Sequence, residues 1–292
     1  MGVIELDSLT KYYGEIRGIE NLSFEVEEGE IFGYLGPNGA GKTTTIRTLL
    51  GFLKPTSGRA RVLGRDIGKE IVEIKQEVGY IPGDLSLYGN LTGKEFLDYF
   101  ASLRSSNSSM LDDLLDTFEV PFERKIEGFS RGMKQKLAIV QAFMHDPKLV
   151  IMDEPTAGLD PLMQQKLYEF LEQEKEKGKT LFFSSHILSE VDKICDRVGI
   201  IREGRLVALE GIESLKSKRG KVVRVKIEGD PEKFDGPEDT KIEDGGWIQF
   251  IVREDINYWI EKLSKFNVLD LEVQNFSLED IFMHYYEEGE TK

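Results

Sequence analysis

The feature that most constrains this chain is the run of residues 36–44, which reads G-P-N-G-A-G-K-T-T. Apolar, strand-forming residues, 31–35, precede this run, and Ile46, Leu49 and Leu50 follow it at helical spacing. The order of strand, glycine loop and helix is the context that a phosphate-binding loop requires. The alternative is a glycine turn that ends in Lys-Thr by chance, and the flanking strand and helix disfavour it.

The residue types in this loop have physical roles toward an anion. Gly36, Gly39 and Gly41 lack Cβ atoms, so the backbone can adopt strained conformations and approach a ligand closely. The N–H groups then suit an anion, and the following helix adds the positive end of its dipole. That dipole contributes only about 0.3–1 kcal/mol, whereas a micromolar dissociation constant for a nucleotide corresponds to a binding free energy of about −8 kcal/mol. Lys42 must therefore supply charge to the outer phosphates, and Thr43 a hydroxyl ligand for Mg²⁺.

Composition and charge narrow the class of function. The sequence has 292 residues, of which 40% are hydrophobic and 31% charged, as is typical of a soluble globular protein. Its net charge of −15 disfavours broad electrostatic binding to nucleic acid or to anionic lipid. Any polyphosphate site must then be locally positive within a repelling field. We expect no nucleic-acid partner.

The sequence also predicts a cytoplasmic location. No apolar run approaches the roughly 18 residues that a membrane span needs, and no basic and apolar leader opens the chain. Cys195 is the single cysteine, which excludes an internal disulfide and fits a reducing compartment. Because Cys195 lies in an amphipathic helical pattern, a buried apolar role is favoured over a nucleophilic one.

The pattern of strands and helices predicts two domains. Residues 1–212 alternate strands and helices, which is typical of an α/β fold with a mainly parallel sheet, and about 84–145 within them are mostly helical. Lys, Ser and Gly concentrate at 213–220, which predicts a linker. The remainder of 213–292 predicts a small α+β domain, with a last helix that begins at Ser277.

Two carboxylates follow the apolar run 149–152, which predicts a buried strand of a parallel sheet. Such strand ends are where parallel sheets bind ligands. Asp153 can hold Mg²⁺, and Glu154 is placed to orient or deprotonate an attacking water. His186 follows the next predicted strand, 180–184, and can reach a γ-phosphate from there. For Asp153 and Glu154 the alternative is a solvated acidic turn, and for His186 it is a structural or solvent-facing histidine.

A further candidate anion site is Ser130-Arg131-Gly132, which precedes a predicted helix. Its hydroxyl, glycine backbone and helix N-terminus are suited to an anion. Taken by itself this pattern is more typical of an ordinary N-cap.

Together these segments resemble the ATP-binding cassette family over roughly residues 3–212, with the P-loop NTPase core, antiparallel β subdomain and helical insert of that family. The resemblance rests on the loop 36–44, the signature Phe129-Ser130-Arg131-Gly132-Met133, the strand 149–154, Gly158-Leu159-Asp160 and His186. It is closest to ATPase subunits of exporters whose membrane part is a separate chain. The C-terminal residues are similar to the accessory domain that such subunits often carry.

The resemblance implies an ATPase that uses ATP and Mg²⁺, with Lys42, Glu154 and His186 as catalytic residues. The residues implied to contact ATP from the loop are Gly36, Pro37, Asn38, Gly39, Ala40, Gly41, Lys42, Thr43 and Thr44. Thr43 and Asp153 are implied as metal ligands.

The resemblance also implies contacts outside the loop. Tyr13 falls where the family stacks an aromatic ring on adenine, with an ordinary strand-end tyrosine as the alternative. Ser130 and Gly132 would bind the γ-phosphate of a nucleotide held by a second copy, and Asp160 would contact that copy across a homodimer.

The sequence departs from the family at two places. The signature reads Phe-Ser-Arg-Gly-Met instead of Leu-Ser-Gly-Gly-Gln, but Ser130 and Gly132, which are able to touch phosphate, are kept. Gly83 stands where the family has a glutamine that helps to hold Mg²⁺ and senses the transport partner. Asp84 is the candidate that would replace it as a metal ligand.

The implied partners are a separate transmembrane permease and a second ATPase copy. The helical insert and the groove near residues 83–91 would receive the permease, and hold the subunit at the inner face of the membrane. The alternative is the ATPase of a soluble machine for ribosome or DNA maintenance, but such relatives carry two cassettes or long coiled coils. For residues 213–292 a ligand-sensing role and a packing or dimer-stabilising role stay open.

Overall fold

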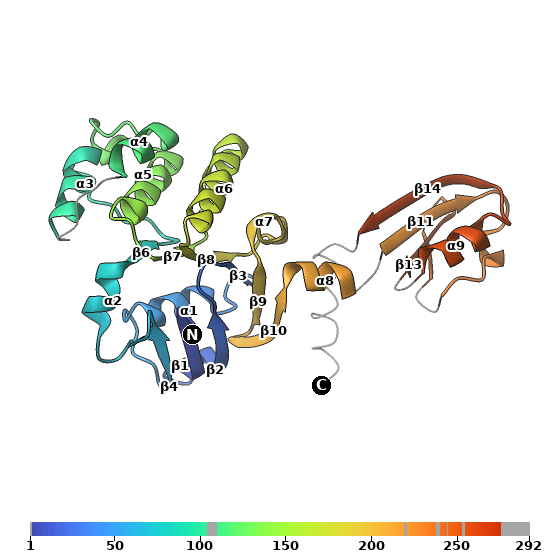
Figure 1. Cartoon of the computed structure of the whole chain (residues 1–292), viewed down its shortest axis with the longest axis horizontal. Helices are drawn as coiled ribbons and strands as arrows, with labels where there is room; N and C mark the ends of the chain where they lie inside the picture. The colour runs from blue at the N-terminus through green and yellow to red at the C-terminus, as the bar shows by residue number, and fades with distance from the viewer. Residues whose placement is uncertain are drawn as a thin grey trace. The chain divides into compact units, whose positions relative to one another are not determined.

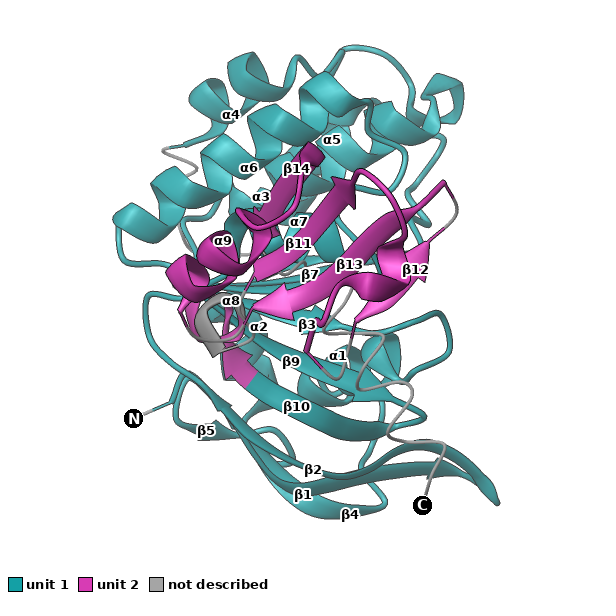
Figure 2. Ribbon diagram, turned by 90° about the vertical axis from the view of Figure 1, so that its right-hand side faces the viewer, with its two compact units in different colours: residues 1–209 teal, residues 210–292 magenta. Residues whose placement is uncertain are grey.

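The computed structural model describes residues 2–103, 110–218, 221–237, 240–243, 245–252 and 255–275. The chain divides into two compact units, residues 1–209 and 210–292, which Figure 2 colours separately. The sequence placed its domain boundary nearby, between residues 212 and 213. Within the described ranges, no helix is both long enough and apolar enough to cross a membrane.

The larger unit is built on a mainly parallel sheet with the strand order β10-β9-β3-β8-β7-β6. Strand β3 pairs in parallel with β8 and β9, and β7 pairs in parallel with β6 and β8. The strands are β3 (Ile31–Leu35), β6 (Val78–Ile81), β7 (Leu149–Asp153), β8 (Thr180–Ser185), β9 (Arg197–Arg202) and β10 (Arg205–Gly211). Strands β3, β7 and β8 are buried along their whole length, as their continuous apolar character predicts.

A second, antiparallel sheet has the order β2-β1-β4-β5. Its strands are β1 (Ile4–Tyr13), β2 (Ile16–Val26), β4 (Ser57–Val62) and β5 (Arg65–Asp66). Helix α1 (Lys42–Leu49) contacts β7 of the first sheet and both β2 and β4 of the second, so it lies between the two sheets. The shared core includes stacked Phe24 and Phe32, whose ring centroids are 5.5 Å apart. The predicted α/β fold with an antiparallel subdomain is confirmed.

The helical segment forms a group of its own, and Figure 1 shows α3, α4 and α5 gathered away from the antiparallel sheet. The helices between α1 and β7 are α2 (Ile71–Glu77), α3 (Gly93–Ser102), α4 (Leu111–Phe118), the 3₁₀ turn η1 (Ile126–Gly128) and α5 (Arg131–Phe143). A capping box begins α3, because Thr92 Oγ1 accepts from the N–H of Glu95 and the N–H of Thr92 donates to the Glu95 carboxylate.

Helices α6 (Pro161–Glu176) and α7 (Leu188–Ile194) flank the strand β8 in sequence. Helix α7 packs on β3 and β8, and its approach depends on Gly33 in the middle of β3. A Cβ atom on Gly33 would stand 2.7 Å from Val191 Cγ1 and 3.0 Å from Cys195 Sγ. The small residue therefore lets α7 lie close against the central strand. Cys195 is buried there, in the apolar role that the sequence favours.

The smaller unit has an antiparallel sheet of order β12-β13-β11-β14. Its elements are α8 (Ile212–Lys218), β11 (Lys221–Ile227), η2 (Pro231–Lys233), β12 (Lys241–Glu243), β13 (Trp247–Val252), α9 (Ile256–Leu263) and β14 (Val268–Asn275). The alternating apolar residues of β11 and β13 are buried in its core together with Phe234 and Leu263. Arg224 of β11 pairs with Glu272 on the adjacent strand β14 and with Glu243 on β12, one strand beyond β13.

The structure corrects one expectation in this part of the chain. Residues 213–220 were predicted as a linker, but most of this stretch belongs to helix α8. Ile212 and Leu215 are three residues apart and both are buried, so one face of the helix is shielded from solvent, which composition could not reveal. The predicted last helix, from Ser277, lies outside the described residues.

Gly33→Ala is expected to destabilise the larger unit by about 1–3 kcal/mol, because an added methyl group overpacks the contact between β3 and α7. Urea unfolding should show a lower midpoint. Gly128→Ala is the matched control, since its Cβ would meet only the flexible Arg124 side chain at 3.9 Å. Adding Val191→Ala to the Gly33 variant should recover part of the loss. Equal midpoints for the two glycine variants would contradict the packing argument.

Candidate functional site

The glycine loop joins β3 to α1, and its backbone geometry demands glycine. Gly39 (φ +82°) and Gly41 (φ +112°) lie in the left-handed region, where other residues are strained. A Cβ atom on Gly41 would stand 2.8 Å from the carbonyl oxygen of Gly18. One on Gly36 would stand 2.4 Å from the carbonyl oxygen of Ile201. The loop thus has the strained and closely packed backbone that its glycines predict.

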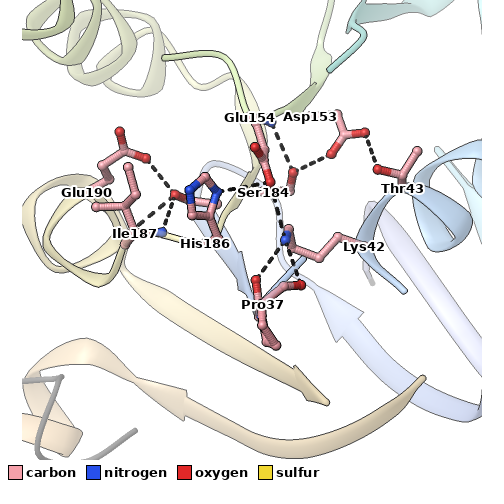
Figure 3. Close-up of polar contacts among 11 residues, drawn as sticks. Pro37, Lys42, Thr43, Asp153, Glu154, Ser184, His186, Ile187 and Glu190 are labelled. Carbon is pink, nitrogen blue, oxygen red and sulfur yellow. Dashed lines mark hydrogen bonds and ion pairs between the residues drawn. The ribbon is translucent and has the colours of Figure 1, made fainter. Parts of the chain in front are cut away.

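Lys42 begins α1, and its ammonium group turns back toward the loop (Figure 3). Nζ donates hydrogen bonds to the carbonyl oxygens of Gly36, at 2.7 Å, and Pro37, at 3.2 Å. It also lies 3.3 Å from Glu154 Oε1, and the Lys42 side chain is only 5% exposed. A buried ammonium group needs such partners because the desolvation of an unpaired charge is costly. These partners hold the positive charge at the centre of the loop.

Thr43 and Asp153 meet between the start of α1 and the end of β7. Thr43 Oγ1 donates to Asp153 Oδ2 at 2.7 Å, and Ser184 Oγ donates to Asp153 Oδ1 at 2.7 Å. A carboxylate and a hydroxyl are the hard oxygen ligands that suit Mg²⁺, which is often bound by one or two carboxylates together with substrate phosphates. The described ranges contain no group of three or more His, Cys, Asp or Glu residues able to hold a metal. One hydroxyl, from Thr43, and one carboxylate, from Asp153, fit a Mg²⁺ ion whose other ligands come from a nucleotide.

Glu154 and His186 lie on the other side of Lys42. Glu154 Oε1 is 3.1 Å from His186 Nδ1, and the His186 side chain is 43% exposed. Glu154 itself has a left-handed backbone, with φ +51°, which is uncommon for a residue with a side chain. Its N–H donates to the backbone oxygen of Ser184, at 3.2 Å, and to Ser184 Oγ, at 3.1 Å. The neighbouring strand β8 thus sustains this backbone conformation.

Tyr13 lies at the end of β1 beside the loop. Its hydroxyl is 3.4 Å from Thr44 Oγ1, and about half of the side chain is exposed. Tyr13 lines a cavity of about 270 Å³ together with Asn38, residues 42–44 of the loop and Glu154. The structure therefore brings an aromatic ring, the glycine loop and the carboxylate together around one space, as the sequence expected.

Ser130, Gly132 and Asp160 are not among the residues that line this cavity. Ser130 caps α5 by accepting a hydrogen bond from the N–H of Met133, at 3.2 Å, and Asp160 caps α6 by accepting one from the N–H of Met163, at 3.0 Å. A Cβ atom on Gly132 would stand 2.8 Å from the carbonyl oxygen of Gly158, so the starts of these two helices lie close together. Within one chain, these three residues therefore form a separate group.

Gly83 lies directly beside the metal candidate, whereas Asp84 does not. A Cβ atom on Gly83 would be 3.2 Å from the backbone oxygen of Asp153 and 3.3 Å from its Oδ2. Asp84 is exposed, and no hydrogen bond or ion pair joins it to Thr43 or Asp153, all three of which are described. The metal-binding role of Asp84 stays a prediction.

Burial and the Asp153 carboxylate raise the pKa of nearby Tyr80 to about 12.

Sequence reasoning missed Ser184 as a member of the site. Ser184 pairs in register with Asp153 because β7 and β8 are adjacent parallel strands. It donates to one carboxylate oxygen and also holds the backbone of Glu154. The available signal was its position two residues before His186, at the end of a predicted strand. Only the strand order shows that its hydroxyl reaches Asp153.

Comparisons with known proteins agree with this geometry. The family model described as ABC transporter matches residues 19–157. The bacitracin transport ATP-binding protein BcrA of Bacillus licheniformis is 40% identical over 229 residues, which are 77% of this chain and 75% of that protein. The uncharacterized ABC transporter ATP-binding protein YhcH of Bacillus subtilis is 33% identical over 99% of this chain and 97% of its own length.

A solved structure shares the fold as well. The structure of an ATP-binding subunit of an ABC transporter superposes with a TM-score of 0.69 at 32% identity, and covers 73% of this chain and 92% of that one. The resemblance that the sequence motifs indicate is therefore confirmed. This chain belongs to the ABC transporter family, as one of its ATP-binding and ATP-hydrolysing subunits.

Proposed function

We propose that this ATPase subunit powers export through a separate membrane subunit, and that two copies close over two ATP molecules in each cycle. The observation that carries the proposal is the convergence of Lys42, Asp153 and Glu154 on the glycine loop. The bacitracin transport relative supports transport as the coupled process. The resemblance to exporter ATPases supports the outward direction. A role in a soluble machine is not favoured, because the relatives are transporter subunits.

In the proposed mechanism, Lys42 exchanges its contacts with Glu154 and the loop carbonyls for oxygens of the outer phosphates. Mg²⁺, held by Thr43 and Asp153, would neutralise part of the charge on those phosphates. Glu154 accepts a proton from the attacking water as the water oxygen bonds to the γ-phosphorus and the bond to ADP breaks. His186, 3.1 Å from Glu154, steadies the γ-phosphate. Most of the rate enhancement comes from positioning and charge stabilisation.

The second half of each site would come from the other copy. Ser130 and Asp160 begin helices α5 and α6, where unpaired backbone N–H groups carry partial positive charge. Gly132 lies in the first turn of α5, and without a side chain it allows a phosphate to approach the backbone. We assign these residues to the γ-phosphate and to the subunit contact of the partner's site, which explains their separation from the loop within one chain.

An apolar groove supports the proposed permease contact. It has a volume of about 550 Å³ and is lined from the segment after α1, from α2, β6, the residues after β6, α3 and α5, including Phe52, Tyr80, Leu85, Tyr88 and Phe96. Phe52 is 54% exposed, and Tyr88 is also exposed. Contiguous exposed apolar surface of this kind marks an interaction site, and a groove fits an amphipathic helix. A short cytoplasmic helix of the membrane subunit would bind here and hold the ATPase at the inner face of the membrane.

Glu154→Gln is expected to keep ATP binding while slowing hydrolysis by about 10²–10⁴-fold, because the amide cannot accept the proton of the water. With ATP and Mg²⁺ the variant should elute as a dimer on a sizing column. Glu172→Gln, at an exposed position of α6, is the control and should leave the rate unchanged. Hydrolysis at the normal rate by the Glu154 variant would refute its assigned role.

Phe52→Glu is expected to abolish binding to the membrane subunit while the isolated ATPase keeps its rate, because a carboxylate in an apolar groove is costly to desolvate. The measurement is cosedimentation with vesicles that contain the co-expressed membrane subunit. Val207→Glu, at an exposed apolar residue of β10, is the control. If Phe52→Glu cosediments as well as the unaltered protein, the groove is not the docking site.

A further inference from the structure

The residues on either side of His186 are held by a buried polar contact. Ser185 Oγ donates to Glu190 Oε2 at 2.5 Å, and the N–H of Ile187 donates to Ser185 Oγ at 2.9 Å (Figure 3). These bonds close a tight turn with His186 at its centre. Ser185 is fully buried and Glu190 is 6% exposed, whereas 43% of the His186 side chain is exposed. The restraint on the histidine therefore comes from its neighbours.

A third side chain completes this group from another helix. The Tyr168 side chain, on α6, is buried near the carboxylate of Glu190, on α7. Burial, together with the negative charge of Glu190, raises the pKa of the Tyr168 hydroxyl. Glu190 thus connects the end of β8 with α6 and α7.

A buried carboxylate is costly unless donors surround it, and apolar residues of similar volume would often give equal or greater stability. Glu190 accepts a short, charge-assisted hydrogen bond from Ser185 and lies near the Tyr168 hydroxyl. A buried carboxylate with such partners therefore fixes the geometry of the turn around His186. Ser184, the preceding residue of β8, faces the opposite way and holds Asp153 and Glu154. The last two residues of β8 therefore anchor the two sides of the site.

We propose that Ser185, Glu190 and Tyr168 form a brace that positions His186 for hydrolysis. The inference rests on the proposed role of His186 at the γ-phosphate. None of the three touches the nucleotide in this proposal, so each is a positioning residue. The brace sets the turn at His186, and the turn keeps the imidazole within 3.1 Å of Glu154. Because α6 begins at Asp160, the brace also ties His186 to the helix that is proposed to contact the second copy.

The first test is a kinetic comparison of Ser185→Ala, Glu190→Ala and Tyr168→Phe in the full chain. Since displacement of a catalytic group by about 1 Å can cost about 10²-fold, we expect kcat to fall between about 10-fold and 10²-fold. The KM for ATP should change by less than about twofold, because Lys42 and the loop are untouched. Glu190→Gln keeps an acceptor oxygen and should recover part of the activity that Glu190→Ala loses.

A double-mutant cycle asks whether the brace acts through His186. In a His186→Ala background, Ser185→Ala should cause no further loss of kcat. Equal losses in both backgrounds would overturn the brace and leave the role of His186 intact. A normal kcat for His186→Ala would overturn both proposals. Glu174→Gln is the control, since it alters a fully buried glutamate of α6 that is paired with Lys177 and Lys179 and lies outside the brace. It should lower the unfolding midpoint and leave kcat unchanged.

Imidazole NMR gives a readout that does not depend on residual activity. The chain has three histidines, and His186 is assigned by its absence in the His186→Ala spectrum. The His186 ring signals should shift in Ser185→Ala and Glu190→Ala, and stay in place in Glu174→Gln. Unchanged ring signals in both brace variants would show that the brace does not position the imidazole.

Discussion

The site depends on the parallel pairing of β3, β7 and β8. Leu35 lies opposite Ser185 in the β3–β8 pair, and Asp153 lies opposite Ser184 in the β7–β8 pair. Parallel strands end at the same edge of a sheet, so the glycine loop, the two carboxylates and the histidine turn converge there. A register shift of one residue would turn the side chains at these strand ends to the opposite face. The chemistry therefore depends on backbone pairing before any side chain contributes.

Charge compensation is the second constraint. The chain carries a net charge of −15, yet it places one nearly buried ammonium group, Lys42, at the centre of the loop. Loop carbonyls and Glu154 hold that charge. A polyphosphate offers the same ammonium group stronger acceptors, so its entry would separate Lys42 from Glu154 and release the carboxylate for a water molecule. The Lys42–Glu154 ion pair would thus couple the binding of a nucleotide to the release of Glu154 as the general base.

Much of the site was predictable because its signals are local. The loop 36–44 has glycines where left-handed backbone occurs, at Gly39 and Gly41. The apolar run before Asp153 is a buried strand, and the capping pattern at Thr92 is a capping box. Periodicity and capping act within a few residues, so a single sequence carries them. The roles of Ser184 and the brace could not be found this way, because Ser184–Asp153 and Tyr168–Glu190 join residues that are far apart in the chain.

By itself, the sequence determined the fold class, the phosphate loop and the family, since each follows from residue types at short spacing. The tertiary structure alone decided which strand ends are neighbours and which polar side chains are buried together. It also showed that residues 212–218 form a helix, where composition indicated a linker, and that Ile212 and Leu215 of this helix are buried. Gly83 illustrates the same division, since only the fold places it against Asp153. Burial is a property of the packed chain, and local pattern does not encode which distant residues provide it.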